Sequence, residues 1–379
     1  MKLKRRKYKP GDEVYINKLY KLITNIDRSL PEYEWEWLNT WNGQGSIWLL
    51  FDEERKENGQ LIGQYSLIPA PFSIWGESYL AGKTENCMSH PDYRGKGIYF
   101  PHEKKYFKEA QEKFQLFFTT AGNAAKGTPG AVRRKLGYVA FDSWIEYIYC
   151  TNSNALHKRI YPKLESKIGS IFGLIKLMSI MISKICFMYT YMFSPKRANQ
   201  SIKLLNENNS PINEIEALWN RNKTLYGITV DRTSSYLNWR INQNPYCEHK
   251  YLLYYKDDKL IGYIIFKIND NVIRVVDILA ENKDQSIFKV MIDNLIIYSK
   301  KEKIGFIICS TLKGNKILKK VFHRNGFIKI DTFSLKKIFS KTNNQKPFHV
   351  FISKKVVVSK DIFNPENWYV TGLVTEGRS

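Results

Sequence analysis

The chain has 379 residues, of which 43% are apolar and 14% aromatic. This composition is ample for packed cores and excludes a disordered chain, and the length suggests two or three domains. The formal net charge of +23 favours anionic partners such as a phosphorylated cofactor, a nucleic acid or an acidic membrane surface. A lysine-rich, solvated surface without any such partner would give the same composition.

Cysteine and histidine usage indicates a reducing compartment. The five cysteines are scattered without a Cys-x-x-Cys pair, and the six histidines show no ligand spacing. We therefore expect a cytoplasmic protein without a structural zinc site or another metal. The basic start, "MKLKRRKYKPGDE", is not followed by an apolar segment, so a secretory signal is not expected.

The first 150 residues predict an alternation of helices and strands. Residues 11–41 have apolar residues at helical spacing and end in a tryptophan-rich stretch. Strands are predicted for "SIWLLFD", "LIGQYSLIPAPFSIWG" and "SYLAGKTENCMS". The last of these leads into "HPDYRGKGIYF", residues 90–100, and then into a helix with Pro101 in its first turn. A buried strand, "FQLFFTTAGN", a short helix ending at Gly137 and a further strand complete this unit.

Residues 168–193 form a strongly apolar segment that only Lys176 and Lys184 interrupt. Two buried lysines would cost several kcal/mol in a spanning helix, so we expect an amphipathic helix or a helical hairpin. Such a segment either packs between domains or lies on an anionic membrane surface.

From Ile212 onward the chain repeats the order of the first unit: helix, hairpin, strand, helix, strand, helix. The hairpin is predicted to turn at Asp257 and Asp258. There is no strong sequence repeat, but the order of the predicted elements is duplicated. The second unit has no Gly-x-Gly, because "VVDILAENKDQ" leads directly into "SIFKVMIDNL".

The Gly-x-Gly of the first unit is placed to bind a phosphate. A strand that opens into two glycines and a helix presents unpaired N–H groups at the positive end of the helix dipole. Arg94 and Lys96 add charge, so the loop suits a pyrophosphate. A Rossmann motif would need a third glycine where Phe100 stands, and the Walker-like "GNAAKGT" has its Lys-Gly order reversed.

"MSHPDYRGKGIYF" resembles the acyl-CoA motif of the GNAT acetyltransferase superfamily, Arg/Gln-x-x-Gly-x-Gly/Ala. "FFTTAGN…AVRRKLGY" is similar to the second signature of that family. The two motifs cover residues 1 to about 150, and the whole layout resembles the tandem-GNAT proteins of bacteria and archaea. The resemblance implies an α/β (α+β) fold of two GNAT-like mixed-sheet units in tandem, joined by an apolar helical segment. We divide the chain into an acyl-CoA-binding domain (1–150), an apolar helical linker or hairpin (151–205) and a degenerate second domain (206–379).

The resemblance also places the contacts to CoA. The pyrophosphate cradle would be formed by Arg94, Gly95, Lys96, Gly97 and Ile98. The splayed strand that holds pantetheine and the thioester carbonyl would be formed by Cys87, Met88 and Ser89. Asn123 would approach the pantetheine arm. Two residues depart from the family pattern: Tyr99 stands where Gly or Ala is usual, and Arg133 stands where many members have the tyrosine that protonates the leaving thiolate.

Glu85 is the best-placed candidate for the catalytic base, because its strand leads into the expected thioester site. A solvated carboxylate without a catalytic role is the alternative. Trp35, Trp37 and Trp41 lie where GNAT proteins build their acceptor wall, and we select Trp35 and Trp41 as substrate-binding residues; the alternative is an ordinary core.

The leading hypothesis is an N-acyltransferase that moves an acetyl group from acetyl-CoA, as cosubstrate, to a primary amine. The acceptor would be a small molecule or a glycan, such as an amino sugar of surface-polymer synthesis, and the enzyme would be cytoplasmic, either free or peripheral on the cytoplasmic face of a membrane. Nucleic acid is not an expected partner of such an enzyme. Two alternatives stay open: a FemABX-like transferase that takes aminoacyl-tRNA, and a non-catalytic module that binds CoA or a polymer.

Overall fold

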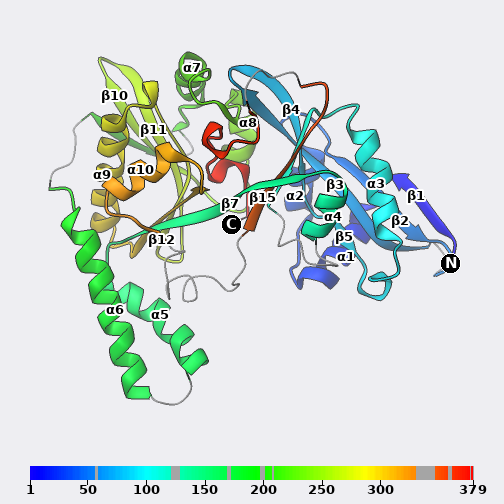
Figure 1. The fold of residues 1–379 in the computed structure, drawn as a ribbon, viewed down its shortest axis with the longest axis horizontal. Coiled ribbons are helices and arrows are strands. Elements are labelled where there is room, and N and C mark those ends of the chain that lie inside the picture. Colours follow the sequence, from blue (N-terminus) through cyan, green and yellow to red (C-terminus); the bar gives the residue numbers. More distant parts are fainter. Residues whose placement is uncertain are drawn as a thin grey trace.

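The computed structural model describes residues 1–55, 59–120, 129–168, 172–196, 201–206, 209–329, 346–356, 361–375 and 377–378. Two α/β lobes lie side by side, and a pair of helices projects from the second lobe (Figure 1). The N-terminus lies at the outer edge of the first lobe, and the C-terminal segment lies between the lobes.

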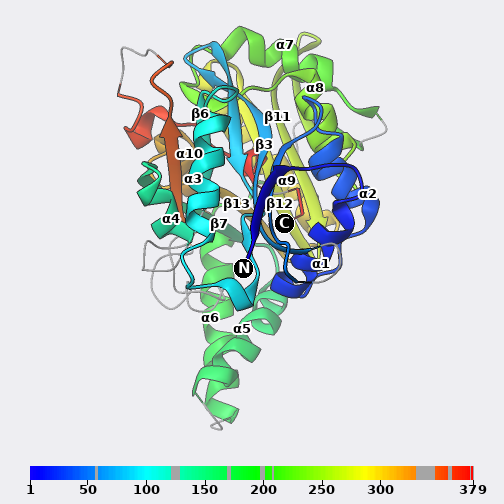
Figure 2. The same cartoon turned by 90° about the vertical axis from the view of Figure 1, so that its right-hand side faces the viewer.

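The first lobe is a mixed sheet with helices on both faces. Its strands are β1 (Leu3–Lys7), β2 (Ser46–Asp52), β3 (Gln60–Ile74), β4 (Glu77–Thr84), β5 (Met88–Ser89) and β6 (Leu116–Thr119). Its helices are α1 (Glu13–Thr24), α2 (Leu30–Tyr33), α3 (Tyr99–Ala110) and α4 (Pro129–Lys135). Figure 2 shows α3 and α4 on one side of the sheet and α1 and α2 on the other. Side chains of β3 point to the two faces in turn. Tyr65 packs towards α3, whereas Ile68, an odd number of positions away, joins the core under α1.

The second lobe repeats this order. Its strands are β8 (Ile202–Asn206), β9 (Ile228–Val230), β10 (Lys250–Lys256), β11 (Lys259–Asn269), β12 (Val272–Ala280), β13 (Phe306–Leu312) and β14 (Ile328–Lys329). Its helices are α7 (Ile212–Asn222), α8 (Ser234–Leu237), α9 (Gln285–Lys301) and α10 (Lys316–Arg324). The predicted hairpin turn is confirmed, because Asp257 and Asp258 connect β10 and β11 with φ of 49° and 58°.

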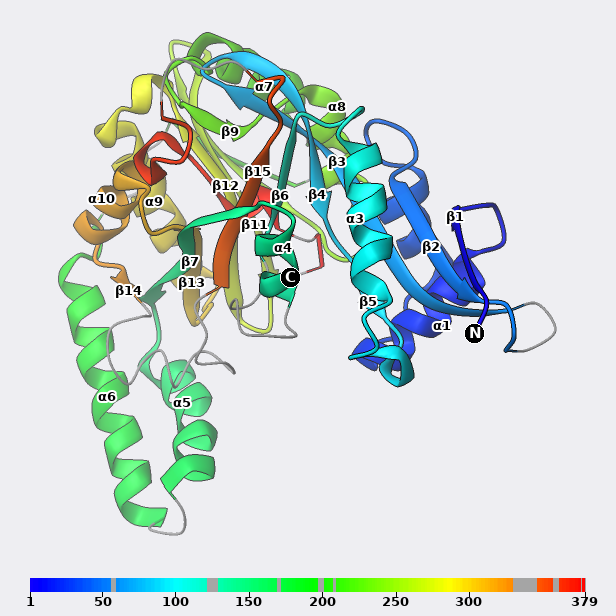
Figure 3. The ribbon, with the colours of Figure 1, turned by 45° about the vertical axis from the view of Figure 1, so that its right-hand side comes forward.

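The strands of both lobes belong to one continuous sheet of order β1-β2-β3-β4-β6-β15-β7-β13-β12-β11-β10-β8, and β9 of the second lobe also pairs with β3 of the first. The long strand β7 (Val139–Cys150) pairs with β15 through its first half and with β13 and β14 through its second half. β15 (Lys346–Ile352), from the end of the chain, pairs with β6 and β7. Figure 3 shows β15 lying beside β6 and β7. A cut between the halves would therefore expose unpaired strand edges in both lobes.

The apolar segment is a helical hairpin of α5 (Ser153–Ile168) and α6 (Phe172–Met192). Figures 1 and 3 show it projecting away from the sheet rather than lying between the lobes. The backbone of Thr190 ties α6 to β7, because it accepts a hydrogen bond from the Tyr149 hydroxyl at 2.7 Å. Within the described part of the chain, none of the helices combines the length and the apolar character that a membrane crossing requires.

Candidate active site

The glycine loop between β5 and α3 is held by its flanks and open at its centre. The His90 side chain caps the turn Pro91–Tyr93, and the Tyr93 hydroxyl donates a 2.7 Å hydrogen bond to Asp52. Gly95 and Gly97 have φ of 77° and 74°, and a Cβ at either position would meet nothing within 4 Å. The loop therefore leaves space beside the first turn of α3, whose N–H groups lack helical partners.

The sheet opens next to this loop. β4 and β6 pair only as far as Lys83 and Phe118. The chain then bends at Asn86, where φ is 46°, and β5 pairs back onto β3. Cys87, Met88 and Ser89 thus lie on a strand segment that has left β6. We call this divergence of the two strands the opening in the sheet.

Tyr99, the first residue of α3, packs against the sheet. Its hydroxyl donates a 2.8 Å hydrogen bond to the Gln64 carbonyl. A Cβ on Gly63 would lie 3.2 Å from the Tyr99 ring, so glycine at this position makes room for the ring. The side chain is thereby anchored on β3 beside the opening.

Arg133 of α4 and Glu103 of α3 form a buried ion pair on the α3 side of the opening. Burial alone would lower the pKa of Arg133, but the Glu103 carboxylate and nearby acidic groups raise it well above its ordinary value. Arg133 therefore keeps its proton and cannot serve as a general acid. Burial raises the pKa of the Cys87 thiol to about 12, so this cysteine is not a thiolate nucleophile at neutral pH.

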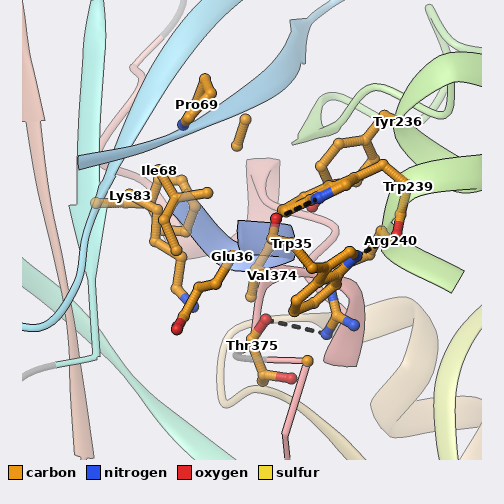
Figure 4. A pocket seen from close by; sticks show the side chains of 13 residues that line it. Trp35, Glu36, Ile68, Pro69, Lys83, Tyr236, Trp239, Arg240, Val374 and Thr375 are labelled. Carbon is orange, nitrogen blue, oxygen red and sulfur yellow. Dashed lines mark hydrogen bonds between the residues drawn. The ribbon is translucent and has the colours of Figure 1, made fainter. Parts of the chain in front are cut away.

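A pocket opens on the opposite face, between the lobes (Figure 4). It is lined by Trp35, Glu36, Ile68, Pro69, Ala70, Lys83, Phe118, Tyr236, Trp239, Arg240, Val374, Thr375 and Gly377. Lys83 and Phe118 are also the last residues at which β4 and β6 pair with each other. The pocket thus adjoins the opening in the sheet, across from the glycine loop.

Two stacked tryptophans form the part of the pocket where the lobes meet. The rings of Trp35 and Trp239 are 5.1 Å apart with an interplanar angle of 21°. Each indole N–H donates a 2.9 Å hydrogen bond to the backbone carbonyl of the other residue. Both tryptophans stand six positions after a capping residue, Ser29 in one lobe and Thr233 in the other. The two halves thus contribute equivalent elements to one wall.

Two carboxylates lie at or beside the pocket, and both are paired with cations. Glu36 is buried and accepts a 3.0 Å hydrogen bond from Arg28 and another from Arg378. Lys83 forms a 3.0 Å ion pair with Glu85, and both side chains are largely buried. Glu85 itself does not line the pocket but contacts it through Lys83. The wall therefore combines an aromatic surface with fixed charges of both signs.

The tryptophans that the sequence suggested for the acceptor wall lie at different distances from the pocket. Trp35 lines the pocket, whereas Trp37 is fully buried. Trp41 lies behind the wall, with its ring edge-on to Tyr236 and its N–H donating to the Pro69 carbonyl at 2.8 Å. Asn123 lies outside the described residues.

Sequence reasoning missed Glu36, Lys83 and all contributions from residues after 205: Tyr236, Trp239, Arg240, Val374, Thr375 and Gly377. One signal was available, since "SLPEYEW" and "TSSYLNW" both place a tryptophan six residues after a capping Ser or Thr. Among the residues that the structure describes, no group of three or more His, Cys, Asp or Glu side chains is placed to hold a metal ion.

The fold is that of the GNAT N-acetyltransferases. It is similar to a probable N-acyltransferase from Enterococcus faecalis (TM-score 0.64, 14% identity) and to a GCN5-related N-acetyltransferase from Anabaena variabilis (TM-score 0.58, 13% identity). Eis1 from Mycobacterium abscessus is a further neighbour (TM-score 0.54, 12% identity). In each case the match covers 93% of this chain and 73% of the other.

Residues 5–117 match the family model of the acetyltransferase (GNAT) domain. The N-terminal part of the chain is therefore similar to GNAT acetyltransferase domains, as its motifs indicated, and members of this family are acyltransferases. No match was found among curated protein sequences.

Proposed function

We propose that the protein is an N-acyltransferase that moves an acetyl group from acetyl-CoA to a primary amine. One observation carries the proposal: the sheet opens between β5 and β6, with an open glycine loop on one face and a charged aromatic pocket on the other. A thioester that enters along α3 can meet an amine from the pocket only through such an opening.

The donor would be held by backbone and cations. Arg94, Gly95, Lys96, Gly97 and Ile98 would bind the pyrophosphate at the N-terminus of α3. Cys87, Met88 and Ser89 have lost β6 as a neighbour, so their backbone groups on that edge can pair with the pantetheine amides. Asn123 would approach the same arm. These residues support CoA as the cosubstrate.

The transfer needs a neutral amine and an exit for the thiolate. The amine nitrogen attacks the thioester carbonyl, the C–S bond breaks, and the amine loses a proton. We assign Glu85 to accept this proton, directly or through water, because it lies at the end of β4 beside the opening. Arg133, fixed as a cation, can stabilise negative charge near the leaving sulfur but cannot protonate it.

The pocket suits an acceptor with an apolar or ring-shaped body that presents a primary amine. Trp35 offers an aromatic face, and Trp41 supports the wall through Tyr236. Glu36, Lys83 and Arg240 add charged groups to the lining. An amino sugar of surface-polymer synthesis, as a small molecule or part of a glycan, has this chemistry. We assign such an enzyme to the cytoplasm or its membrane face, with donor binding in residues 1–150, the linker in 151–205 and acceptor shaping in 206–379.

A non-catalytic module that binds CoA or a polymer is the second candidate, because an arginine held by Glu103 replaces the tyrosine expected in the family. The two functions differ in turnover and not in CoA binding. A screen of primary amines with acetyl-CoA, in which the free thiol of released CoA is measured, separates them. If the protein binds CoA but releases no free thiol with any amine, the result favours the module. Tight binding of aminoacyl-tRNA, with none of CoA, would favour the FemABX-like alternative.

Donor binding is tested at Gly97 with two variants of equal size. Gly97 has a left-handed φ, which Asn and Asp tolerate better than most residues. Gly97→Asp adds a carboxylate against the pyrophosphate and should weaken CoA binding at least about 100-fold. Gly97→Asn should weaken it much less. Calorimetry that finds equal CoA affinity in both variants and the wild type would overturn the donor assignment.

A further inference from the structure

Helix α6 exposes a stripe of large apolar residues and buries three hydroxyl residues beside other apolar residues, Ile182, Cys186 and Phe187, that pack against the core. Ser179, Ser183 and Thr190 are at most 1% exposed. Six large apolar residues are between 41% and 80% exposed: Leu177, Met178, Met181, Ile185, Met188 and Met192. At 100° per residue these six lie on the side of the helix opposite the three buried hydroxyl residues. We call them the outer face of α6.

Inward contacts fix this orientation. The Thr190 hydroxyl donates a 2.7 Å hydrogen bond to the Cys150 carbonyl at the end of β7. Ser179 is 2.8 Å from the His157 ring of α5, and Ser183 donates to the Ser179 carbonyl. Rotating the helix to bury its apolar residues would break the bonds of Ser179 to α5 and of Thr190 to β7, and would leave the Cys150 carbonyl without this donor. The exposed apolar surface is therefore a property of the folded chain.

The charges around the outer face are of one sign. Residues 172–192 contain no Asp or Glu, and residues 151–200 contain eight Lys or Arg against one Glu. Lys176 and Lys184 are exposed on α6, and Lys196 is exposed just beyond it. At 100° per residue Lys184 borders the outer face, whereas Lys176 lies on the flank towards the buried hydroxyl residues. An apolar stripe with Lys184 at its edge and Lys196 beyond its end matches the boundary of an anionic lipid layer, where apolar side chains enter the acyl region and ammonium groups meet phosphates.

We propose that the outer face of α6 docks, in the plane of the membrane, on an anionic phospholipid surface. The helix is about 30 Å long at 1.5 Å per residue, so it can lie along the surface with its apolar residues directed into it. A second copy of the chain fits less well. Two-fold pairing about the middle of the stripe would bring the two Lys184 side chains together, between molecules that each carry a net charge of +23. This proposal stands independently of acyl transfer.

Vesicle flotation of the full-length chain tests the proposal. Wild type should float with vesicles of phosphatidylcholine and phosphatidylglycerol at low salt, and less at high salt or with phosphatidylcholine alone. Met181→Glu/Ile185→Glu places two carboxylates on the outer face and should reduce binding at least about tenfold. The matched control is Val14→Glu/Leu22→Glu, which makes the same kind of change at two exposed apolar positions of α1 and should bind like the wild type.

Thermal melting identifies any variant that fails to fold. If the glutamate variant of α6 does not fold, Lys176→Gln/Lys184→Gln provides the test instead, because it removes only exposed charge. That variant should lose salt-sensitive binding to the anionic vesicles. Failure of the wild type to float with anionic vesicles overturns the proposal. Equal loss in the α1 and α6 variants also overturns it, since total charge would then be the cause. A concentration-dependent dimer that only the α6 variant abolishes, without vesicle binding, would assign the face to a second copy.

Discussion

Arg133 of α4 and Glu103 of α3 form an ion pair whose side chains are 3% and 0% exposed. It lies beside the opening in the sheet, at the position where the family resemblance led us to expect a tyrosine. The pair links the two helices that flank the expected donor path, and its loss would leave a charge without a partner in the interior.

Breaking this pair should destabilise the protein more than removing it altogether. Glu103→Leu and Arg133→Met should each lower the free energy of unfolding by about 3–5 kcal/mol, because each leaves one buried charge unpaired. The double variant should recover most of that loss. Urea unfolding of the three variants and the wild type gives the coupling between the sites. Additive losses in the double variant would show that the pair does not act as a unit.

Glu85 should matter for turnover and not for CoA binding. Glu85→Gln should slow turnover by roughly 100-fold, the usual size of a general-base effect. Glu77→Gln is the matched control, because Glu77 lies on the same strand and is exposed. The measurement is kcat at saturating substrates across a pH series. A loss smaller than about tenfold at every pH would reassign Glu85 to holding Lys83.

Local patterns were enough to predict the donor side of the site. A Gly-x-Gly after a strand and before a helix is a contiguous signal, and the structure has Gly95 and Gly97 at positive φ directly before α3. One predicted strand, "SYLAGKTENCMS", is in fact two, β4 and β5, separated by a bend at Asn86. No glycine or proline between Lys83 and Ser89 marks this bend, so pattern alone could not locate it.

The acceptor side could not be predicted in the same way. Trp35 and Trp239 are 204 positions apart, and their contact depends on how the lobes pack. The placement of β15 between β6 and β7 likewise follows from pairing across the whole chain, which periodicity within a segment does not encode. The outer face of α6 was recognisable as apolar, but a helical pattern does not say which side faces solvent.

Buried His102 should make the protein less stable below neutral pH. Burial lowers its pKa from 6.5 to about 4, so the folded state resists a proton that the unfolded state accepts. Stability is then fully present above pH 6.5 and falls as the pH drops from 6.5 towards 4, by about 3 kcal/mol in total. His102→Gln removes the titration and keeps a donor for the Trp48 carbonyl.

Urea unfolding at pH 7.5 and pH 5 measures this difference. The wild type should lose more stability than His102→Gln between the two values, because the variant has one fewer group that takes up a proton on unfolding. His249, whose pKa burial lowers to about 3, is present in both proteins and cancels in the comparison. An equal decline in the two proteins would show that His102 titrates normally in the fold.

Trp239 should control acceptor binding from the second lobe. It stacks on Trp35 and exchanges hydrogen bonds with it, so Trp239→Leu removes half of an aromatic wall and leaves the Trp35 indole without its partner ring. The KM for the amine should rise at least about tenfold, while CoA affinity, set by the glycine loop, should stay unchanged. Trp144→Leu is the control, because Trp144 is half-buried on β7 and does not line the pocket. If both variants raise the amine KM equally, the pocket between the lobes is not the acceptor site and the amine must approach from elsewhere.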